Sequence, residues 1–383
     1  MAKTLSAGKL RGVTTLADER GIFKMIAVDQ RPPIFRALAR HGARSPDEVA
    51  YDEVAGVKGL LTEVLAPHCT AVLLDPVWTH PHALTRVPGG VGLLSTLEDH
   101  AFVLKAGERW SYPIAGWSAY KAKRSGAAGV KLLVWDRPDS REDTRAHQDA
   151  FVFEVGRACR EHDLAFVLEL LIYPRPGEEE DSPAYAAAKP DGVLDSVAHY
   201  SDDTFGVDLL KLEFPADLKH CREFSRGAFD GRERASVYTL DEVREALDEL
   251  NRLANVPWVL LSAGVGPREF ALNLELACEA GASGFLAGRA VWLDALDSYP
   301  DLAEMRSRLV NRSLPYLGQI AALAAGAKPW TAHRAFNDLE VAGRGPDWYK
   351  SYGDETHAHE THAHETHGDE THGDETHGDK EQA

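Results

Sequence analysis

The sequence predicts an α/β fold, a single (β/α)8 TIM barrel with an extra C-terminal helix and a disordered tail. Short apolar runs recur between about residues 20 and 300, and each is followed by a stretch of helical character. The runs are continuously apolar rather than alternating, which is typical of parallel strands covered on both faces. No GxGxxG motif follows the first run, so an open dinucleotide-binding sheet is the less favoured alternative. Eight strands alternating with helices over about 270 residues indicate the barrel.

The strands are read from apolar and β-branched segments that end in polar or small residues. Seven are clear and an eighth, near Gly92–Ser95, is weaker. The clear ones are Phe23–Asp29, Ala71–Asp75, Gly129–Trp135, Ala165–Leu171, Val207–Glu213, Trp258–Ala263 and Gly284–Ala287.

Helix starts are legible between the strands. Ser45-Pro46-Asp47-Glu48 is a capping box with proline at the first helical position. Thr239-Leu240-Asp241-Glu242 is a second capping box, and Gly266-Pro267 opens a helix that Gly281 ends. Leu302–Ala325 predicts one more helix, which closes the barrel.

Composition divides the chain. The net charge is −18, of which residues 354–383 carry −9 through ten acidic residues and one lysine. This segment repeats the pentads DETHA, HETHA, HETHG, DETHG and DETHG, and it has too little apolar surface to fold. We predict three parts: residues 1–325 as the barrel domain, 326–353 as a C-terminal extension whose packing is unassigned, and 354–383 as a disordered tail. The histidines of the tail are His357, His359, His362, His364, His367, His372 and His377.

The remaining composition excludes several classes of protein. The body carries only a mild negative charge, which argues against a nucleic-acid partner. No run approaches the length of a membrane-spanning helix, and the N-terminus lacks the apolar core of a secretory signal. The four cysteines are widely spaced and form no CxxC motif, which fits free thiols in a reducing compartment. We therefore expect a cytoplasmic protein without nucleic-acid or membrane partners.

In TIM barrels the working groups stand at the carboxyl ends of the strands. The polar residues at these positions are Asp29-Gln30-Arg31, Asp75-Pro76, Lys131, Glu169, Lys211, Glu213, Ser262-Ala263-Gly264 and Gly288-Arg289.

Strand alternation predicts which of these side chains face inward. Lys211 and Glu213 share one face of their strand, and Glu169 and Lys131 can point into the same barrel mouth. Desolvation and a neighbouring ammonium lower the pKa of a buried lysine, which leaves the free amine that Schiff-base chemistry requires. A nearby carboxyl group can then move protons. The alternative is a salt-bridge network of these lysines and Glu169 that only fastens the barrel, and spacing alone does not decide between the two.

A second signal follows the seventh and eighth strands. The small residues of Ser262-Ala263-Gly264 and Ala287-Gly288 let backbone N–H groups approach an anion, at the position of the common phosphate site of these barrels. Arg289 adds a permanently charged, forked partner. The alternative is that the glycines make tight turns and that Arg289 pairs with an acid such as Asp294. We favour phosphate.

Seven motifs in order resemble the class I tagatose 1,6-bisphosphate aldolase family, including its sulfofructose-1-phosphate branch. The resemblance covers about residues 10 to 320 and leaves out the tail. The combination is specific although no single motif is. The motifs are AVDQR (27–31), LLDP (73–76), GVKLLV (129–134), LELLIY (168–173), FGVDLLKLEFP (205–215), LSAGV (261–265) and GRAVW (288–292).

The resemblance implies an aldolase that reversibly cleaves a ketose phosphate and releases dihydroxyacetone phosphate. It implies that Lys211 is the Schiff-base lysine and that Glu169 transfers protons. The residues at substrate-binding positions are Asp29, Gln30 and Lys131, and those at the phosphate of the dihydroxyacetone half are Ser262, Gly264, Gly288 and Arg289.

Two loops depart from the family pattern. The loop after the second strand contains Trp78, His80 and His82, and the loop after the fourth contains Arg137 and Arg141. We expect these loops to contact the distal end of the sugar, so the identity of the substrate stays open. An arginine binds a phosphate or a sulfonate equally well, because both are tetrahedral anions.

No cofactor and no catalytic metal are expected. His80, His82 and His100 lie in loops rather than on strands, which argues against a class II zinc site. The His-rich tail can bind zinc, nickel or copper weakly, although we favour a solvated tail without such a role.

Three functions are carried forward. The leading one is a class I aldolase acting on a ketose bisphosphate such as tagatose 1,6-bisphosphate. The second is 6-deoxy-6-sulfofructose-1-phosphate aldolase. The third, from another class, is a non-catalytic barrel that binds phosphosugars and has a regulatory role. The expected partners are a phosphorylated ketose and further copies of the same chain in a homo-oligomer.

Overall fold

The computed structural model describes residues 4–80, 82–342, 345–350 and 352–353. Residues 1–342 form one compact unit and residues 343–383 a second. In the second unit the described residues include a 3-10 turn at Trp348–Lys350. The predicted tail, residues 354–383, lies outside the described residues.

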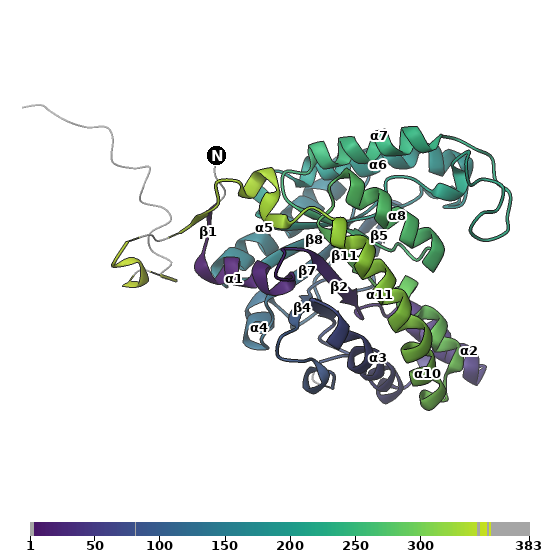
Figure 1. Ribbon diagram of the computed structural model, residues 1–383, viewed down its shortest axis with the longest axis horizontal. Coiled ribbons are helices and arrows are strands. Elements are labelled where there is room, and N and C mark those ends of the chain that lie inside the picture. The colour runs from purple at the N-terminus through teal and green to yellow at the C-terminus, as the bar shows by residue number, and fades with distance from the viewer. Residues whose placement is uncertain (1–3, 81, 343–344, 351, 354–383) are drawn as a thin grey trace, which may run out of the picture. The chain divides into compact units, whose positions relative to one another are not determined.

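The first unit is built on a closed barrel of eight parallel strands, which confirms the predicted fold class. Around the barrel the strand order is β10-β11-β2-β3-β4-β7-β8-β9. Figure 1 shows the strands at the centre with helices around them. The strands are β2 (Phe23–Ala27), β3 (Ala71–Leu74), β4 (Gly92–Thr96), β7 (Gly129–Trp135), β8 (Ala165–Leu171), β9 (Leu209–Leu212), β10 (Trp258–Leu261) and β11 (Gly284–Ala287).

Helices follow most of the strands, as expected for a (β/α)8 barrel, whereas β3 and β4 are joined by a loop with only the 3-10 turn Leu84–Arg86. A short hairpin, β5 (Val103–Lys105) and β6 (Glu108–Trp110), is inserted after β4. The helices are α1 (Ala7–Leu16), α2 (Pro32–Gly42), α3 (Tyr51–Leu65), α4 (Ala119–Arg124), α5 (Glu142–Glu161), α6 (Pro183–Tyr200), α7 (Leu240–Leu253), α8 (Pro267–Ala280), α9 (Arg289–Trp292), α10 (Leu302–Arg308) and α11 (Leu314–Leu323).

The predicted helix signals are mostly where the sequence indicates. Thr239 caps α7 with the reciprocal Glu242 contact, and Gly281 ends α8 with a φ of 117°. The box at Ser45 opens only one 3-10 turn, because Val49 and Ala50 return to extended backbone before α3 begins. The final helix is interrupted by a π turn at Leu309–Ser313, which separates α10 from α11.

Side chains inside the barrel and those under the helices form two separate apolar clusters. Met25, Val167, Leu209, Val259 and Leu286 belong to the interior cluster, and their strand neighbours pack outward. Alternation along β9 therefore turns Lys211 inward with Leu209, and alternation along β8 turns Glu169 inward with Val167. The apolar interior ends at this level, and polar side chains occupy the mouth above it.

The segment after α11 closes the opposite end of the barrel. Trp330 and Phe336 are buried, and their rings meet edge to face at 5.0 Å. Both belong to the interior cluster, together with Leu16 and Phe23. Farther along the chain, the two-residue strand β12 (Glu340–Val341) pairs in parallel with β1 (Thr4–Leu5), which lies at the amino-terminal end of the sequence. Residues from both ends of the unit thus cover the amino-terminal mouth of the barrel.

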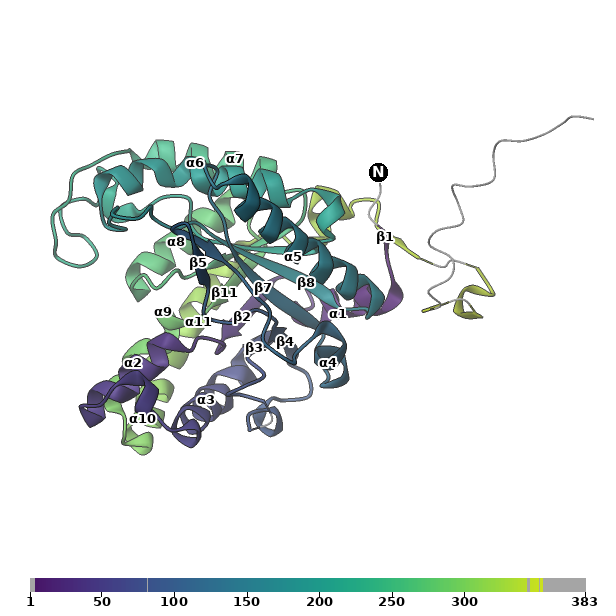
Figure 2. The ribbon, with the colours of Figure 1, turned by 180° about the vertical axis from the view of Figure 1, so that it is seen from behind.

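Helices α10 and α3 pack together beside the barrel, as both views of the ribbon allow the reader to follow (Figures 1 and 2). Within the described residues, no helix combines the length and apolar character that crossing a membrane requires.

Candidate active site

The mouth at the carboxyl ends of the strands holds a buried network of charged side chains. At its centre is Lys131 on β7, whose ammonium contacts three carboxylates. Its Nζ lies 2.8 Å from Asp29 Oδ2 and 3.2 Å from Glu169 Oε2, and it also donates to Glu98. Glu98 is held in turn by the Thr96 hydroxyl at 2.6 Å and by a backbone N–H. The network joins four strands of the barrel, β2, β4, β7 and β8.

The charge state of Lys131 follows from this environment. Burial alone would lower the pKa of its ammonium, but Asp29, Glu98 and Glu169 outweigh burial and raise this pKa well above its usual value. Burial likewise would raise the pKa of the Asp29 carboxyl, but the ammonium groups of Lys131 and Lys211 hold it well below its usual range. Lys131 is therefore a fixed cation and a poor nucleophile.

Lys211 stands differently. Its Nζ lies 2.8 Å from Glu169 Oε1, its one carboxylate partner among the described residues, and its side chain is 4% exposed. Glu169 and Lys211 are direct cross-strand neighbours on β8 and β9, which fixes their side chains together. The carboxylate of Glu169 bridges the two lysines, with one oxygen on each. Lys211 therefore combines an amine with a proton acceptor in contact.

A cavity of about 310 Å³ opens above Lys211, within the range of small-molecule sites. Six of the nine predicted site residues line it, namely Lys211, Glu169, Gln30, Ser262, Gly288 and Arg289. Asp29 and Lys131 lie beside it in the charged network, and Gly264 lines the adjoining cavity. The prediction that these residues converge is therefore consistent with their positions.

One end of the cavity is shaped by glycines. A Cβ on Gly264, where φ is +85°, would come within 2.9 Å of the Arg289 guanidinium carbon. A Cβ on Gly288 would come within 2.7 Å of Gln30 Nε2. Arg289 has no hydrogen-bond or ion-pair partner in the described part of the chain, so the alternative pairing with Asp294 is not found. Burial lowers the pKa of its guanidinium, the signature of a desolvated and uncompensated cation.

The other end carries an arginine that sequence analysis missed. Arg109, on the inserted hairpin, lines the cavity, and its guanidinium carbon lies 4.5, 4.3 and 4.9 Å from the ring centres of Phe102, Trp135 and Tyr173. It has no carboxylate within ion-pair distance among the described residues. Stacking on aromatic rings holds the guanidinium in place while leaving its N–H groups free for an anion.

The arginines expected at the distal end are engaged elsewhere. Arg137 forms a forked pair with Asp139, and Arg141 pairs with Asp143, and neither lines the cavity. Of the other departing loop, Trp78 packs on Phe35 with ring centres 5.0 Å apart, away from the lining residues.

Two acidic residues at the mouth, Glu98 and Asp75, differ from what the sequence indicated. Glu98 follows β4, the strand that the sequence marks only weakly, so inspecting polar residues just beyond that strand would have found it. Asp75, one of the polar strand ends, instead forms a fully buried ion pair with Lys58 and accepts the backbone N–H of Trp78 at 2.7 Å. Its role is to hold the β3 loop.

The family is decided by comparison with known proteins. The model of the DeoC/LacD family of aldolases matches residues 24–294. The chain belongs to the DeoC/LacD aldolase family. It is thus an aldolase, a lyase, as the resemblance predicted.

Individual relatives of this DeoC/LacD aldolase cover most of its length. Tagatose 1,6-diphosphate aldolase 1 of Streptococcus mutans serotype c is 31% identical over 307 residues, 80% of this chain and 91% of the relative. Tagatose 1,6-diphosphate aldolase of Staphylococcus epidermidis is 30% identical over 307 residues, again 80% of this chain and 91% of the relative. A solved fructose-bisphosphate aldolase from Plasmodium falciparum has a TM-score of 0.54 at 15% identity, covering 85% of this chain and 98% of that one. That likeness supports the barrel fold.

Proposed function

We propose that this protein is a class I aldolase that cleaves a ketose bisphosphate of the tagatose 1,6-bisphosphate type. The products are dihydroxyacetone phosphate and an aldehyde such as glyceraldehyde 3-phosphate. The observation that carries the proposal is the pair of Lys211 and Glu169 at the floor of the cavity, with an amine and a carboxylate 2.8 Å apart. The names of the relatives, tagatose 1,6-diphosphate aldolases, support the substrate class.

The mechanism assigns one task to each group. Lys211 attacks the ketose carbonyl, and loss of water gives an iminium that accepts the electrons of the breaking C3–C4 bond. Glu169 moves the protons: it takes one from the C4 hydroxyl as the aldehyde leaves and gives one to C3 of the resulting enamine, and water then hydrolyses the regenerated imine to release dihydroxyacetone phosphate and free Lys211. Lys131, held as a cation by three carboxylates, orients the Glu169 carboxylate and positions Asp29 toward substrate hydroxyls. Asp29 Oδ1 and Gln30 Oε1 are buried without a hydrogen-bond partner in the described residues, as expected of groups that await a hydroxyl.

The two ends of the cavity suit a substrate with two anionic groups. Arg289, with Ser262, Gly264 and Gly288, receives the phosphate of the dihydroxyacetone half. Arg109 faces the same cavity from the hairpin and receives the anion at the other end of the sugar. That anion is a phosphate in a ketose bisphosphate and a sulfonate in sulfofructose 1-phosphate. A side-by-side comparison of kcat/KM for the two ketoses separates these substrates.

The first test is reduction by borohydride in the presence of dihydroxyacetone phosphate. An imine between the ketone and Lys211 is reduced to a stable secondary amine, which intact mass and peptide mapping locate. We expect one adduct per chain, on Lys211, although Lys131 is nearby, because Lys131 stays protonated. Saturable binding of dihydroxyacetone phosphate without any adduct would contradict the class I mechanism and favour the non-catalytic phosphosugar-binding barrel.

Arg109 provides a test of the substrate class. Arg109→Gln removes the charge and leaves the aromatic cage. Loss of one charge-assisted hydrogen bond is expected to raise KM for tagatose 1,6-bisphosphate by about 10- to 100-fold. Turnover of a ketose 1-phosphate without a distal anion should change little. The matched control is Arg137→Gln, which removes an arginine of the same rim that is paired with Asp139 and lies outside the cavity lining. Equal KM changes for both substrates would contradict the assignment.

Assembly and location are part of the proposal. The enzyme is expected to be a cytoplasmic homo-oligomer, and weak metal binding by the tail stays the less favoured alternative to a solvated tail without such a role.

A further inference from the structure

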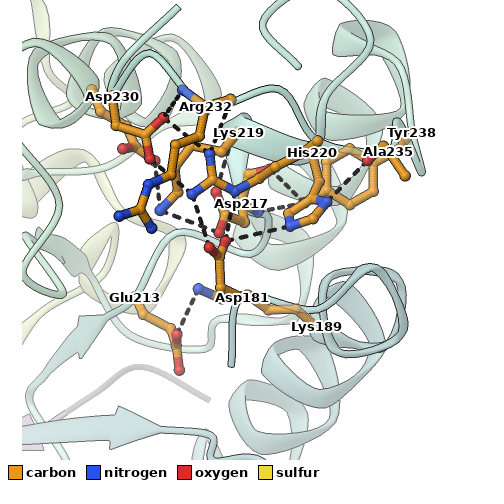
Figure 3. Close-up of polar contacts among 12 residues, drawn as sticks. Asp181, Lys189, Glu213, Asp217, Lys219, His220, Asp230, Arg232, Ala235 and Tyr238 are labelled. Carbon is orange, nitrogen blue, oxygen red and sulfur yellow. Dashed lines mark hydrogen bonds and ion pairs between the residues drawn. The ribbon is translucent and has the colours of Figure 1, made fainter. Parts of the chain in front are cut away.

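Beside the catalytic cavity lies a group of three side chains from two loops. Asp181 belongs to the loop between β8 and α6, whereas Asp217 and His220 belong to the segment that follows β9. One oxygen of each carboxylate and one ring nitrogen of His220 all lie within 4.8 Å of one another. Figure 3 shows the His220 ring between the Asp181 carboxylate on one side and Ala235 on the other.

The His220 ring is buried and its orientation is fixed. Its exposed fraction is 1%. Nδ1 lies 3.0 Å from the carbonyl oxygen of Ala235, an acceptor that requires the hydrogen to be on Nδ1. Nε2 then carries the lone pair, and it has no hydrogen-bond partner among the described residues. The nearest carboxylate oxygen recorded for it, Asp181 Oδ1, is 3.7 Å away, too far for a hydrogen bond.

We propose that Asp181, Asp217 and His220 form a structural binding site for a divalent transition-metal ion, with Zn²⁺ as the fitting species. One imidazole nitrogen and two carboxylate oxygens are ligands that zinc accepts at about 2.0 to 2.2 Å. In the tetrahedral geometry that zinc prefers, such ligands lie about 3.3 to 3.6 Å apart. Asp181 Oδ1 and His220 Nε2 already have nearly this spacing at 3.7 Å, and the group as a whole, whose atoms lie within 4.8 Å of one another, needs to close by at most about 1.5 Å. Histidine ligands of zinc commonly donate their other ring nitrogen to a backbone carbonyl, which is the contact that His220 makes with Ala235.

The neighbouring cations shape this site without filling it. Arg234 donates to both oxygens of Asp181 at 2.7 and 2.8 Å, and Lys219 lies 3.4 Å from Asp217. A carboxylate offers about four lone-pair positions, so Asp181 can bind an ion while Arg234 orients it. Arg234 also pairs with Asp230. Three carboxylates therefore face two cations, and the group keeps a negative charge that favours a metal ion.

The location gives the ion its role. Asp181 and Asp217 line a cavity of about 320 Å³ that shares Glu180, Leu261, Ser262 and Ala263 with the catalytic cavity. A bound ion would join the loop that carries Glu180 to the loop after β9, and so fasten one wall of the catalytic cavity. It takes no part in the cleavage itself, and the proposal does not depend on the identity of the substrate.

The test measures zinc on the full chain. We compare wild type with His220→Asn, whose amide still donates to Ala235 but lacks Nε2, and with Asp217→Asn, which still accepts the backbone N–H of Lys219. Equilibrium dialysis against micromolar zinc chloride should find one more tightly bound zinc per chain in wild type than in either variant. At free zinc about tenfold above Kd, the unfolding midpoint of wild type should rise by about 2 to 4 °C, and those of the variants should not.

The control is His199→Asn, because His199 also pairs with a carboxylate, at 2.8 Å from Asp149, but belongs to no group of three metal-ligating side chains within the described residues. It should bind as much zinc as wild type. The seven tail histidines are present in every chain, so their zinc cancels in the comparison. Equal zinc and equal midpoint shifts in all four chains would overturn the proposal and leave a cluster of ion pairs around Asp181 and Asp217. Should His220→Asn fail to fold without zinc, Asp217→Asn decides alone, because an asparagine keeps the cap that Asp217 supplies.

Discussion

Replacing Lys211 with alanine is expected to lower the turnover of the ketose bisphosphate by at least about 10⁴-fold, because no other amine in the cavity can form the imine. Lys211→Arg should be as inactive. A guanidinium keeps the positive charge beside Glu169 but stays protonated and forms no imine at neutral pH. The two variants together separate covalent catalysis from simple charge. Steady-state cleavage is measured with a coupled assay for dihydroxyacetone phosphate.

Urea unfolding curves check that both variants fold. We expect them to fold, because Glu169 keeps its second contact, with Lys131, when Lys211 is replaced. If Lys211→Ala retained more than about one hundredth of wild-type turnover with a folded structure, the assignment of the nucleophile would be wrong.

Replacing Lys131 with methionine is expected to cost about 3 to 5 kcal/mol of unfolding free energy at pH 8. Methionine fills a similar volume, but Asp29, Glu98 and Glu169 lose the ammonium they share and repel one another in a buried site. Urea unfolding at several pH values measures the loss. Activity should fall as well, because Glu169 and Asp29 lose the group that positions them.

The pH dependence has a definite sign. In wild type the pKa of Asp29 is depressed, so this carboxylate contributes stability above the pKa of the unfolded chain and loses it as pH falls. In Lys131→Met the three carboxylates repel one another, which raises their pKa values. As the pH falls through these values, protonation removes the repulsion and the variant regains stability. The difference from wild type should therefore shrink from pH 8 toward pH 5.

The control is Lys24→Met, a lysine on β2 that pairs with Asp18 at 2.8 Å while both side chains are about a fifth exposed. This substitution should lower the unfolding free energy by less than about 1 kcal/mol, as is usual for partly exposed ion pairs. A Lys131→Met variant no less stable than this control would show that the network contributes nothing to stability.

Much of the fold was readable because parallel strands in a barrel are buried on both faces. Continuous apolar runs therefore marked seven strands clearly and the eighth weakly, and alternation correctly turned Lys211 and Glu169 inward. The capping box at Ser45 placed the start of the helix five residues too early, because a capping box is a local contact and does not reveal whether the helix continues beyond its first turn. The π turn between α10 and α11 has no comparable sequence signal.

The candidate site was less completely predictable. Residues on strands were found because their register is periodic, and Glu98 was missed because it lies two residues beyond β4, the strand that the sequence marks only weakly. Arg109 lies on an inserted hairpin outside the βα repeat, so no periodic rule reaches it. Arg137 and Arg141 looked equally suitable in sequence, and only the positions of Asp139 and Asp143 show that they are already paired.

The pairing of β1 with β12 has a consequence for how the chain is made. A protein leaves the ribosome from its amino terminus, and its first segments fold as their partners emerge. Here Leu5 accepts the backbone N–H of Ala342 at 2.8 Å, so the first strand waits for almost the whole unit to be synthesised. Until Trp330 and Phe336 have been synthesised, the apolar residues at the amino-terminal mouth of the barrel have no cover. A nascent chain thus exposes this apolar mouth until late in translation, and a chain cut at residue 325 would expose it permanently.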